Sequence, residues 1–224
     1  MRLAPEGYPF IVGSLTITVI TGIFTEIWVA LIPLFLTVFM IYFFRDPERE
    51  IPEGDNIFVS PADGKAILIK NVGKDTTPPT PPLLRGGEGG VKDTDRGFIE
   101  ISIFMSPFNV HVNRAPCDGK IKNIQHNKGK FMAAYKDDAS LKNENIEMTL
   151  ETKYGDILVR QVAGYVARRA VCRANAGDSL RRGERYGIIK FSSRLDVYLP
   201  KDTEIKVKLG DKVKAGETVI GVIE

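Results

Sequence analysis

The chain has 224 residues, of which 43% are hydrophobic and 26% charged, and its formal net charge is +3. This length suits one domain of about 150–200 residues plus an appendage, with the composition of an ordinary globular protein. Two cysteines, Cys117 and Cys172, lie far apart in the sequence. That spacing excludes a disulfide framework and a zinc site, and it predicts two reduced thiols.

Two apolar runs, Tyr8–Phe24 and Ile27–Phe44, open the chain, and Glu26 is the only charged residue between Pro9 and Phe44. A membrane-spanning helix needs about 20 apolar residues and tolerates about 17. We expect two short helices forming a transmembrane or membrane-embedded hairpin, because one long helix would bury Glu26 in the middle of the bilayer. A buried hairpin in a soluble protein is the alternative. No cleavage site of small residues follows, which disfavours a signal peptide.

The positive charges beside the apolar runs predict the orientation of the hairpin. Arg2, Arg45 and Arg49 all lie on one side of it, and such residues face the cytoplasm. We therefore expect a membrane anchor at residues 1–48, with the domain of residues 49–224 on the cytoplasmic side of the cell membrane.

The remainder of the chain predicts a mainly β (α+β) domain. Short segments rich in Ile and Val, separated by Gly, Pro, Asp or Asn, favour strands. Residues 74–96, rich in Pro and Gly, read as a flexible surface loop, and Gly129–Tyr135 reads as a short helix. The predicted strands are Asn56–Ser60, Lys65–Lys70, Gly97–Phe104, Ile121–Asn127, Ile146–Thr152, Asp156–Ala163, Gly187–Phe191, Asp196–Leu199, Glu204–Leu209 and Thr218–Glu224.

Two short patterns add to this picture. Pro61-Ala-Asp-Gly-Lys65 is echoed by Pro116-Cys-Asp-Gly-Lys120. Gly210–Gly221 reads as a strand–turn–strand hairpin, similar to the barrel-sandwich hairpins of biotinyl and lipoyl carriers but without a convincing carrier lysine. We expect a barrel-sandwich-like architecture. A non-catalytic, membrane-tethered binding module is one functional hypothesis that fits it.

The second hypothesis is an enzyme whose nucleophile is Ser193. Ser192-Ser193 follows an apolar run, and the Ser193 hydroxyl could attack the Ser192 carbonyl, so that the peptide bond becomes an ester. Cleavage with elimination and hydrolysis would then leave a pyruvoyl group on the downstream fragment. The first step requires strain, a base and oxyanion donors. His111 and His126 are the only histidines, and Asp63 could orient an imidazole. A Ser-Ser pair is a weak signal, and an Asp-Gly pair is usually just a turn.

Four blocks make the resemblance specific: the chain is similar to the phosphatidylserine decarboxylase family, short prokaryotic type, which includes archaetidylserine decarboxylase. The blocks occur in the family's order over nearly the whole chain. They are Phe43-Phe-Arg-Asp-Pro47, Ser60-Pro-Ala-Asp-Gly-Lys65, Phe104-Met-Ser-Pro-Phe-Asn-Val-His-Val-Asn-Arg114 and Gly187-Ile-Ile-Lys-Phe-Ser-Ser-Arg-Leu-Asp196.

The resemblance implies a zymogen that cleaves itself between Ser192 and Ser193, with assistance from Asp63 and His111. The fragments Met1–Ser192 and Ser193–Glu224 would stay together, and Ser193 would become a covalent pyruvoyl cofactor. The substrate, an anionic serine phospholipid such as phosphatidylserine or archaetidylserine, would form a Schiff base with it and lose CO2. No pyridoxal phosphate or metal is implied, and we expect a homo-oligomer. A soluble pyruvoyl enzyme acting on a free amino acid conflicts with the apolar runs.

Two positions depart from the family pattern. Ser192 stands where the family usually has glycine, whose backbone is freer, so Ser192 could slow cleavage or require a different bend. Whether Ser192 is natural or engineered stays open. Arg114 stands where some relatives have a second histidine, which leaves His111 as the base, alone or with His126; we expect His126 in a solvated loop.

Basic residues crowd the stretch before and at the predicted cleavage site. Their density suits an anionic head group or bilayer surface, although a solvated basic face is the alternative. Nucleic acid is disfavoured because no binding motif or aromatic interleaving is present. The residues are Arg160, Arg168, Arg169, Arg173, Arg181, Arg182, Arg185, Lys190 and Arg194.

Overall fold

The computed structural model describes residues 2–72, 97–129, 143–164, 170–191 and 193–223. The chain divides into two compact units. Unit 1 comprises Met1–Glu48 and Phe108–Val110, and unit 2 comprises Arg49–Pro107 and His111–Glu224. The predicted loop at residues 74–96 lies outside the described residues, as does all of the predicted helix Gly129–Tyr135 except Gly129.

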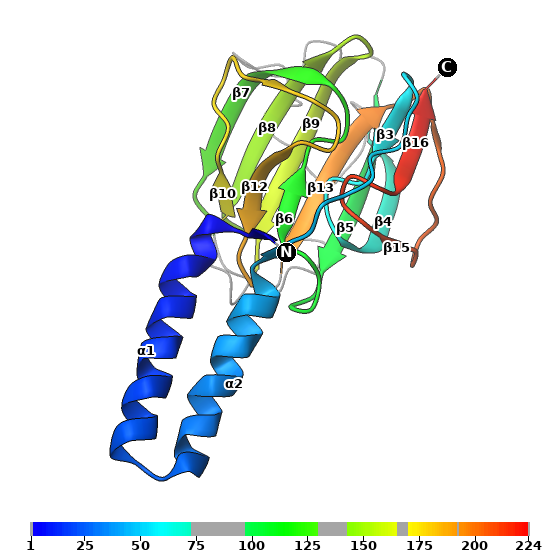
Figure 1. Cartoon of the computed structure of the whole chain (residues 1–224). Coiled ribbons are helices and arrows are strands. Elements are labelled where there is room, and N and C mark those ends of the chain that lie inside the picture. Colours follow the sequence, from blue (N-terminus) through cyan, green and yellow to red (C-terminus); the bar gives the residue numbers. More distant parts are fainter. Residues whose placement is uncertain (1, 73–96, 130–142, 165–169, 192, 224) are drawn as a thin grey trace. The chain divides into compact units, whose positions relative to one another are not determined.

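Unit 1 is a helical hairpin (Figure 1). A 3-10 turn, η1 (Pro5–Gly7), leads into α1 (Tyr8–Phe24), and α2 (Ile27–Phe43) returns beside it. Two short strands, β1 (Arg2–Leu3) and β2 (Arg45–Asp46), pair at the open end of the hairpin. The segment Pro5–Phe24 has a mean hydropathy of 1.6 and is long enough to cross a membrane, whereas α2 is a shorter apolar helix.

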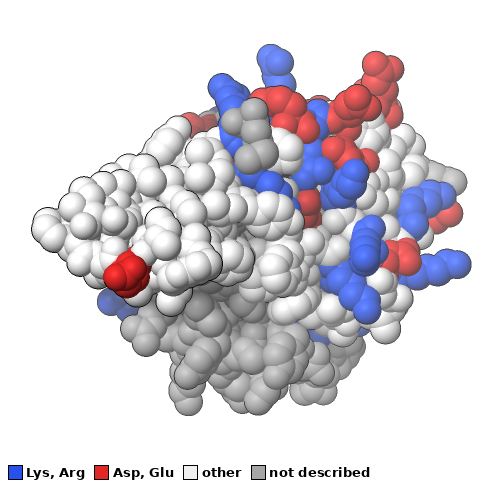
Figure 2. Space-filling model, turned by 60° about the horizontal axis from the view of Figure 1, so that its bottom comes forward, with Lys and Arg blue, Asp and Glu red and all other residues white. Residues whose placement is uncertain are grey.

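Along most of its length the hairpin places its large apolar side chains outside and its small ones inside; Phe43, at the end of α2, is a large side chain that is completely buried. Within the described residues, all but two of the exposed large apolar side chains lie on α1 and α2. Figure 2 shows the result, a nearly unbroken uncharged surface on the helices. The buried positions between the helices are small, among them Ser14, Ala30 and Thr37, and the hydroxyls of Thr18 and Thr37 lie 3.3 Å apart.

Unit 2 is built on one curled, antiparallel eight-stranded sheet, which confirms the mainly β fold (Figure 1). Its order is β11-β7-β8-β9-β13-β5-β4-β15. In chain order these strands are β4 (Gly64–Val72), β5 (Phe98–Met105), β7 (Gly119–Asn127), β8 (Asn145–Thr152), β9 (Gly155–Ala163), β11 (Ser179–Leu180), β13 (Ser193–Pro200) and β15 (Lys212–Val213).

Two three-stranded sheets contribute to the same core. One has the order β10-β12-β6 and the other β14-β16-β3. Side chains from them, such as Phe58, Tyr186 and Ile220, join Ile103 and Val197 of the large sheet in a single buried cluster. The strands are β3 (Ile57–Val59), β6 (Val112–Arg114), β10 (Ala170–Cys172), β12 (Arg185–Ile189), β14 (Thr203–Ile205) and β16 (Val219–Ile223).

The central strand β13 has different side chains on its two faces, because successive residues of a strand point to opposite sides. Leu195, Val197 and Leu199 belong to the apolar core. Arg194 and Asp196 alternate with them and are nevertheless almost completely buried. The sheet therefore carries a buried polar layer on the face opposite its apolar core.

The echoed sequence Pro-x-Asp-Gly-Lys marks an internal duplication. The first copy leads into β4 and the second into β7, and each strand pairs with a two-residue strand at one edge of the large sheet. Those edge strands lie in two further matching segments, Gly177-Asp-Ser-Leu-Arg-Arg-Gly-Glu184 and Gly210-Asp-Lys-Val-Lys-Ala-Gly-Glu217. The backbone contacts match as well: the Gly177 N–H donates to Ile121 O at 2.7 Å and the Gly210 N–H donates to Ala66 O at 2.8 Å.

Several details of the strand predictions were wrong. The segment Gly210–Gly221 contains β15 and the start of β16, but β15 pairs with β4 whereas β16 pairs with β3 and β14, so it is not a hairpin. The predicted strand Glu204–Leu209 shrinks to β14, which ends at Ile205. His126 lies exposed on β7 rather than in a loop.

Candidate active site

Ser193 begins the central strand of the large sheet. It lies opposite Met105 of β5 on one side and Ala163 of β9 on the other, and its side chain is completely buried. Ser192, the residue on the other side of the predicted scissile bond, lies outside the described residues. The nucleophile predicted from sequence therefore lies buried between two neighbouring strands of the sheet.

The Ser193 hydroxyl has a weak hydrogen-bond partner. Its Oγ lies 3.4 Å from the Met105 Sδ, and a thioether is a poor acceptor. A buried hydroxyl that bonded a carbonyl or carboxylate would be held far more firmly. Little hydrogen-bond energy therefore holds this hydroxyl in its present position.

Phe191 adds backbone strain just before the predicted cleavage site. Its φ is 54°, and it is the only residue other than glycine with a positive φ in the described parts of the chain. A bulky residue in the left-handed region costs about 1–3 kcal/mol, and such strain is typically concentrated at functional sites.

His111 is fully buried and lies directly before β6. Its carbonyl accepts a hydrogen bond from the Ile189 N–H at 3.3 Å, at the end of β12. Since Ile189 is four residues before Ser193, the fold brings the backbone of His111 beside the segment that leads to the predicted nucleophile.

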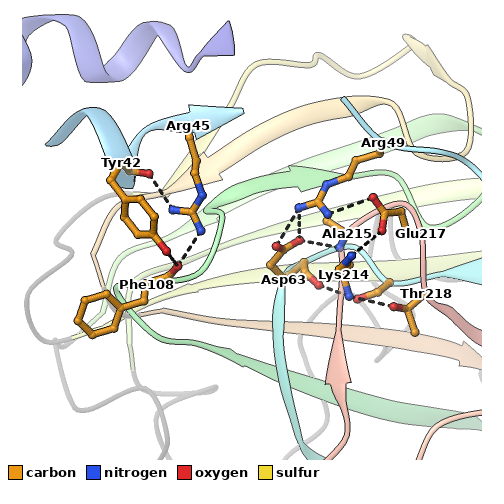
Figure 3. Close-up of polar contacts among 11 residues, drawn as sticks. Tyr42, Arg45, Arg49, Asp63, Phe108, Lys214, Ala215, Glu217 and Thr218 are labelled. Atoms are coloured by element: carbon orange, nitrogen blue, oxygen red, sulfur yellow. Dashed lines mark hydrogen bonds and ion pairs between the residues drawn. The ribbon is translucent and has the colours of Figure 1, made fainter. Parts of the chain in front are cut away.

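Asp63 lies in the turn before β4, where an ionic network holds its carboxylate (Figure 3). Arg49 Nη2 donates to both of its oxygens, at 3.0 and 2.9 Å, and the Ala215 N–H donates to Oδ1 at 2.8 Å. Arg49 Nη1 donates to Glu217 Oε1 at 3.2 Å. No hydrogen bond joins Asp63 to His111 within the described residues. Arg49, which the sequence analysis used only to orient the hairpin, is the main partner of Asp63.

The internal duplication gives Asp63 a structural counterpart, Asp118. Asp118 Oδ1 accepts the Arg182 N–H at 2.7 Å, as Asp63 accepts the Ala215 N–H. The bond from the carboxylate to a backbone N–H is therefore part of the repeated architecture. Asp63 also accepts hydrogen bonds from Arg49 at both of its carboxylate oxygens, and this pairing distinguishes the first copy.

A buried amide pair also lies near Ser193. Gln161 Nε2 donates to Asn113 Oδ1 at 2.9 Å, and Asn113 Nδ2 lies 3.9 Å from the Met105 Sδ. Gln161 Oε1 is buried without a hydrogen-bond partner. The sequence analysis named neither amide as a site residue, although Asn113 lies in the block Phe104–Arg114 that carries the family resemblance.

The basic stretch predicted from sequence does not form one surface patch. Arg160 pairs with Glu147, and Arg194 pairs with Asp196 at 2.6 Å, all of them buried. Burial raises the pKa of Glu100, which also contacts Arg194, and the neighbouring Asp196 raises it further. Arg182 donates to the carbonyls of Pro52 and Gly54. Arg168 and Arg169 lie outside the described residues.

Three other groups named in the sequence analysis have clear positions. Arg114 Nη1 donates to the Gly183 carbonyl at 2.9 Å. Both cysteines are free; burial raises the pKa of Cys117 to about 12 and also raises the pKa of Cys172. The described residues contain no group of three or more His, Cys, Asp or Glu side chains arranged to hold a metal ion.

Comparison with known proteins places this geometry in context. The family model for phosphatidylserine decarboxylase matches residues 36–221. Phosphatidylserine decarboxylase proenzymes from Citrifermentans bemidjiense and Geobacter metallireducens are 46% and 42% identical to the chain. In each case the alignment covers 99% of this chain and 96% of the relative. The proenzyme from Syntrophus aciditrophicus is 42% identical, with 98% and 96% covered.

These matches first define a class: the chain is an enzyme, a decarboxylase of the lyase type, and not a non-catalytic binding module. Membership of this class does not by itself explain why a buried serine begins the central strand. The chain belongs to the phosphatidylserine decarboxylase family.

Proposed function

We propose that the chain is a proenzyme that cleaves itself between Ser192 and Ser193 and then decarboxylates a serine phospholipid. The observation that carries this proposal is the setting of Ser193, whose buried hydroxyl is held only weakly beside a strained Phe191. The names of the relatives support it, since they are proenzymes.

The cleavage chemistry uses atoms of the chain itself. The Ser193 Oγ adds to the Ser192 carbonyl carbon, the amide C–N bond breaks, and an ester with a free amine on Ser193 results. Loss of the Cα proton of Ser193 then expels the Ser192 carboxylate and leaves dehydroalanine. Addition of water and loss of ammonia convert this residue into a pyruvoyl group. His111 acts as the base, and Asp63 with Arg49 positions the surrounding segments.

The pyruvoyl carbonyl supplies an electron sink: the substrate amine condenses with it as a Schiff base, the serine carboxylate leaves as CO2, and an ethanolamine phospholipid is released. The protein surrounds this site with a sheet that excludes water. The buried amides Gln161 and Asn113 provide polar groups on the same side of the sheet as the Ser193 hydroxyl.

We also propose that the hairpin of residues 1–48 is a membrane anchor, with residues 49–224 on the cytoplasmic side. The arrangement of its side chains supports this, because a soluble hairpin buries its large apolar residues, whereas this one exposes them and packs small ones between the helices. Small residues at the interface are typical of helices that pack within lipid. Arg2 and Arg45 lie at one end of the hairpin, as cytoplasmic residues do.

Mass spectrometry under denaturing conditions tests the self-cleavage. We expect two fragments that meet at Ser192/Ser193, the smaller one bearing a pyruvoyl group, and release of CO2 from phosphatidylserine in vesicles. Ser193→Ala should remain intact and inactive. If Ser192 blocks cleavage, Ser192→Gly should restore it. An intact Ser192→Gly chain that releases no CO2 from diester or ether serine lipids would refute the proposal.

A further inference from the structure

Phe108 is a large apolar residue whose side chain is mostly exposed. It is 67% exposed, and the other large apolar side chain exposed outside α1 and α2 in the described residues is Leu209, at 68%. Phe108 lies in the link between β5 and β6, three residues before His111. Leaving a phenylalanine in water forgoes about 1.5–3 kcal/mol of burial, so an exposed one in a site segment calls for an explanation.

The last turn of the hairpin holds the backbone of Phe108 (Figure 3). The Phe108 carbonyl accepts two hydrogen bonds, from the Tyr42 hydroxyl at 3.1 Å and from Arg45 Nη2 at 2.7 Å. Arg45 Nη1 also donates to the Tyr42 carbonyl at 2.7 Å, and its guanidinium stacks 3.8 Å above the Tyr42 ring. Phe108–Val110 accordingly belong to the same compact unit as the helices.

These three residues have the chemistry of a membrane–water interface. Tyrosine places an apolar ring and a polar hydroxyl at the level of the lipid head groups, and arginine keeps its charge in water while its stem covers apolar surface. Tyr42 lies in the last turn of a 17-residue apolar helix, and Arg45 lies just after it. The helix is about 26 Å long, close to the thickness of the hydrocarbon layer. The lipid surface is therefore the partner that fits the exposed ring of Phe108.

We infer that Phe108 inserts into the boundary between head groups and acyl chains, and that the Tyr42–Arg45 clamp fixes it there. This inference rests on the proposed function of the hairpin as a membrane anchor. Phe108 lies three residues before His111 in the chain, so the inserted residue would be close in sequence to the predicted base.

A fluorescence experiment tests the insertion independently of activity. The full-length chain with Trp28→Phe and Phe108→Trp is reconstituted in vesicles that contain lipids brominated near the carbonyl region. Emission from the introduced tryptophan should be blue-shifted and strongly quenched by the bromines. Leu209→Trp in the same background is the matched control, and its emission should remain unquenched. Phe108→Trp emission that matches the control, or that is blue-shifted without quenching as in a protein contact, would overturn the inference.

Activity gives a second measurement. Phe108→Ser should cleave itself normally and decarboxylate monomeric short-chain phosphatidylserine within about twofold of the unchanged protein, yet lose about tenfold on bilayer phosphatidylserine. Leu209→Ser should lose nothing on either substrate. Equal activity of the two variants on bilayers contradicts the inference. If the unchanged protein decarboxylates neither substrate, the proposed function fails, and the quenching result still decides where Phe108 lies.

Discussion

Phe191 is the one residue other than glycine with a positive φ in the described parts of the chain. Glycine adopts a φ of 54° without cost, whereas phenylalanine does not. If cleavage releases this strain, Phe191→Gly should cleave about tenfold more slowly than Phe191→Ala, since about 1.4 kcal/mol corresponds to a tenfold change in rate. Both variants remove the ring, so their ratio isolates the backbone. A time course of freshly made precursor on denaturing gels measures it, and equal rates would show that the strain is not used.

Asp63 and Asp118 form a natural matched pair. Asp63→Asn and Asp118→Asn each weaken a carboxylate bond to a backbone N–H. Asp118 is exposed, so Asp118→Asn should lower stability by about 1 kcal/mol or less. Asp63→Asn also disrupts the buried pair with Arg49 and should cost more, about 3 kcal/mol. If Asp63 assists cleavage, its variant should cleave more than tenfold more slowly, while Asp118→Asn stays within about twofold.

The control for Asp63 concerns its partner, because Asp63→Asn leaves the buried guanidinium of Arg49 with Glu217 as its remaining carboxylate. The double variant Arg49→Met with Asp63→Asn removes that incompletely paired charge. Slow cleavage that persists in the double variant assigns the effect to Asp63. Recovery of the cleavage rate in the double variant would assign the effect to Arg49, which loses a carboxylate partner in Asp63→Asn.

The site could be predicted from sequence only in part, and particular residues show why. Ser193, His111 and Asp63 stand in compact motifs, so their residue types could be named as candidates. Met105, Asn113 and Gln161 are ordinary strand residues whose importance comes from the register that brings them to one face. Arg194 looked like a surface charge because its partners, Asp196 and Glu100, are visible only once strands β5 and β13 are paired.

Among the elements, the hairpin was the easiest to predict and also offers its own probe. The chain has a single tryptophan, Trp28, which is 75% exposed in the first turn of α2. In vesicles its emission should shift to the blue and be quenched by brominated lipids. Quenching from the far leaflet would indicate a spanning hairpin, and quenching at mid-depth a re-entrant one. Emission unchanged from that in water would contradict a membrane anchor.

The positions of the strands along the chain were predicted better than the pairing between strands. Alternation and turn residues located most strands of the large sheet, since that signal is local. The pairing of β15 with β4 was missed because it joins Val213 to Gly64, and nothing in the sequence near Gly210–Gly221 records that distant contact. The matching segments that begin at Gly177 and Gly210 were available as a signal, and they mark the two equivalent edges of the sheet.

For the whole molecule, the positions of β13, β15 and β16 predict that the two fragments stay together after cleavage. The fragment from Ser193 onward would supply the strand between β9 and β5 (Figure 1) and would contact the larger fragment through the Arg49–Glu217 and Asp63–Ala215 bonds. We expect the fragments to coelute in size-exclusion chromatography and to separate only in denaturant.

The Arg49 network should contribute measurably to that cohesion. Arg49→Met should lower the urea concentration at which the fragments separate, because it strands the buried Asp63 carboxylate. Glu217→Gln should have a smaller effect, since the Glu217 side chain is 29% exposed and that of Asp63 is 11% exposed. Dissociation of the unchanged, cleaved protein in plain buffer would contradict this prediction.

The burial of Ser193 between two neighbouring strands has a last consequence for the life of the enzyme. In the proposed chemistry the reactive carbonyl forms only after the sheet has assembled. A misfolded chain would therefore lack the carbonyl, and only correctly folded chains would become active. The pyruvoyl group is covalently part of the chain and does not exchange with free cofactor in solution, and each chain forms it once. Because the hydroxyl that produced it is consumed, a carbonyl lost to reduction cannot be replaced, and activity returns only with newly synthesised protein.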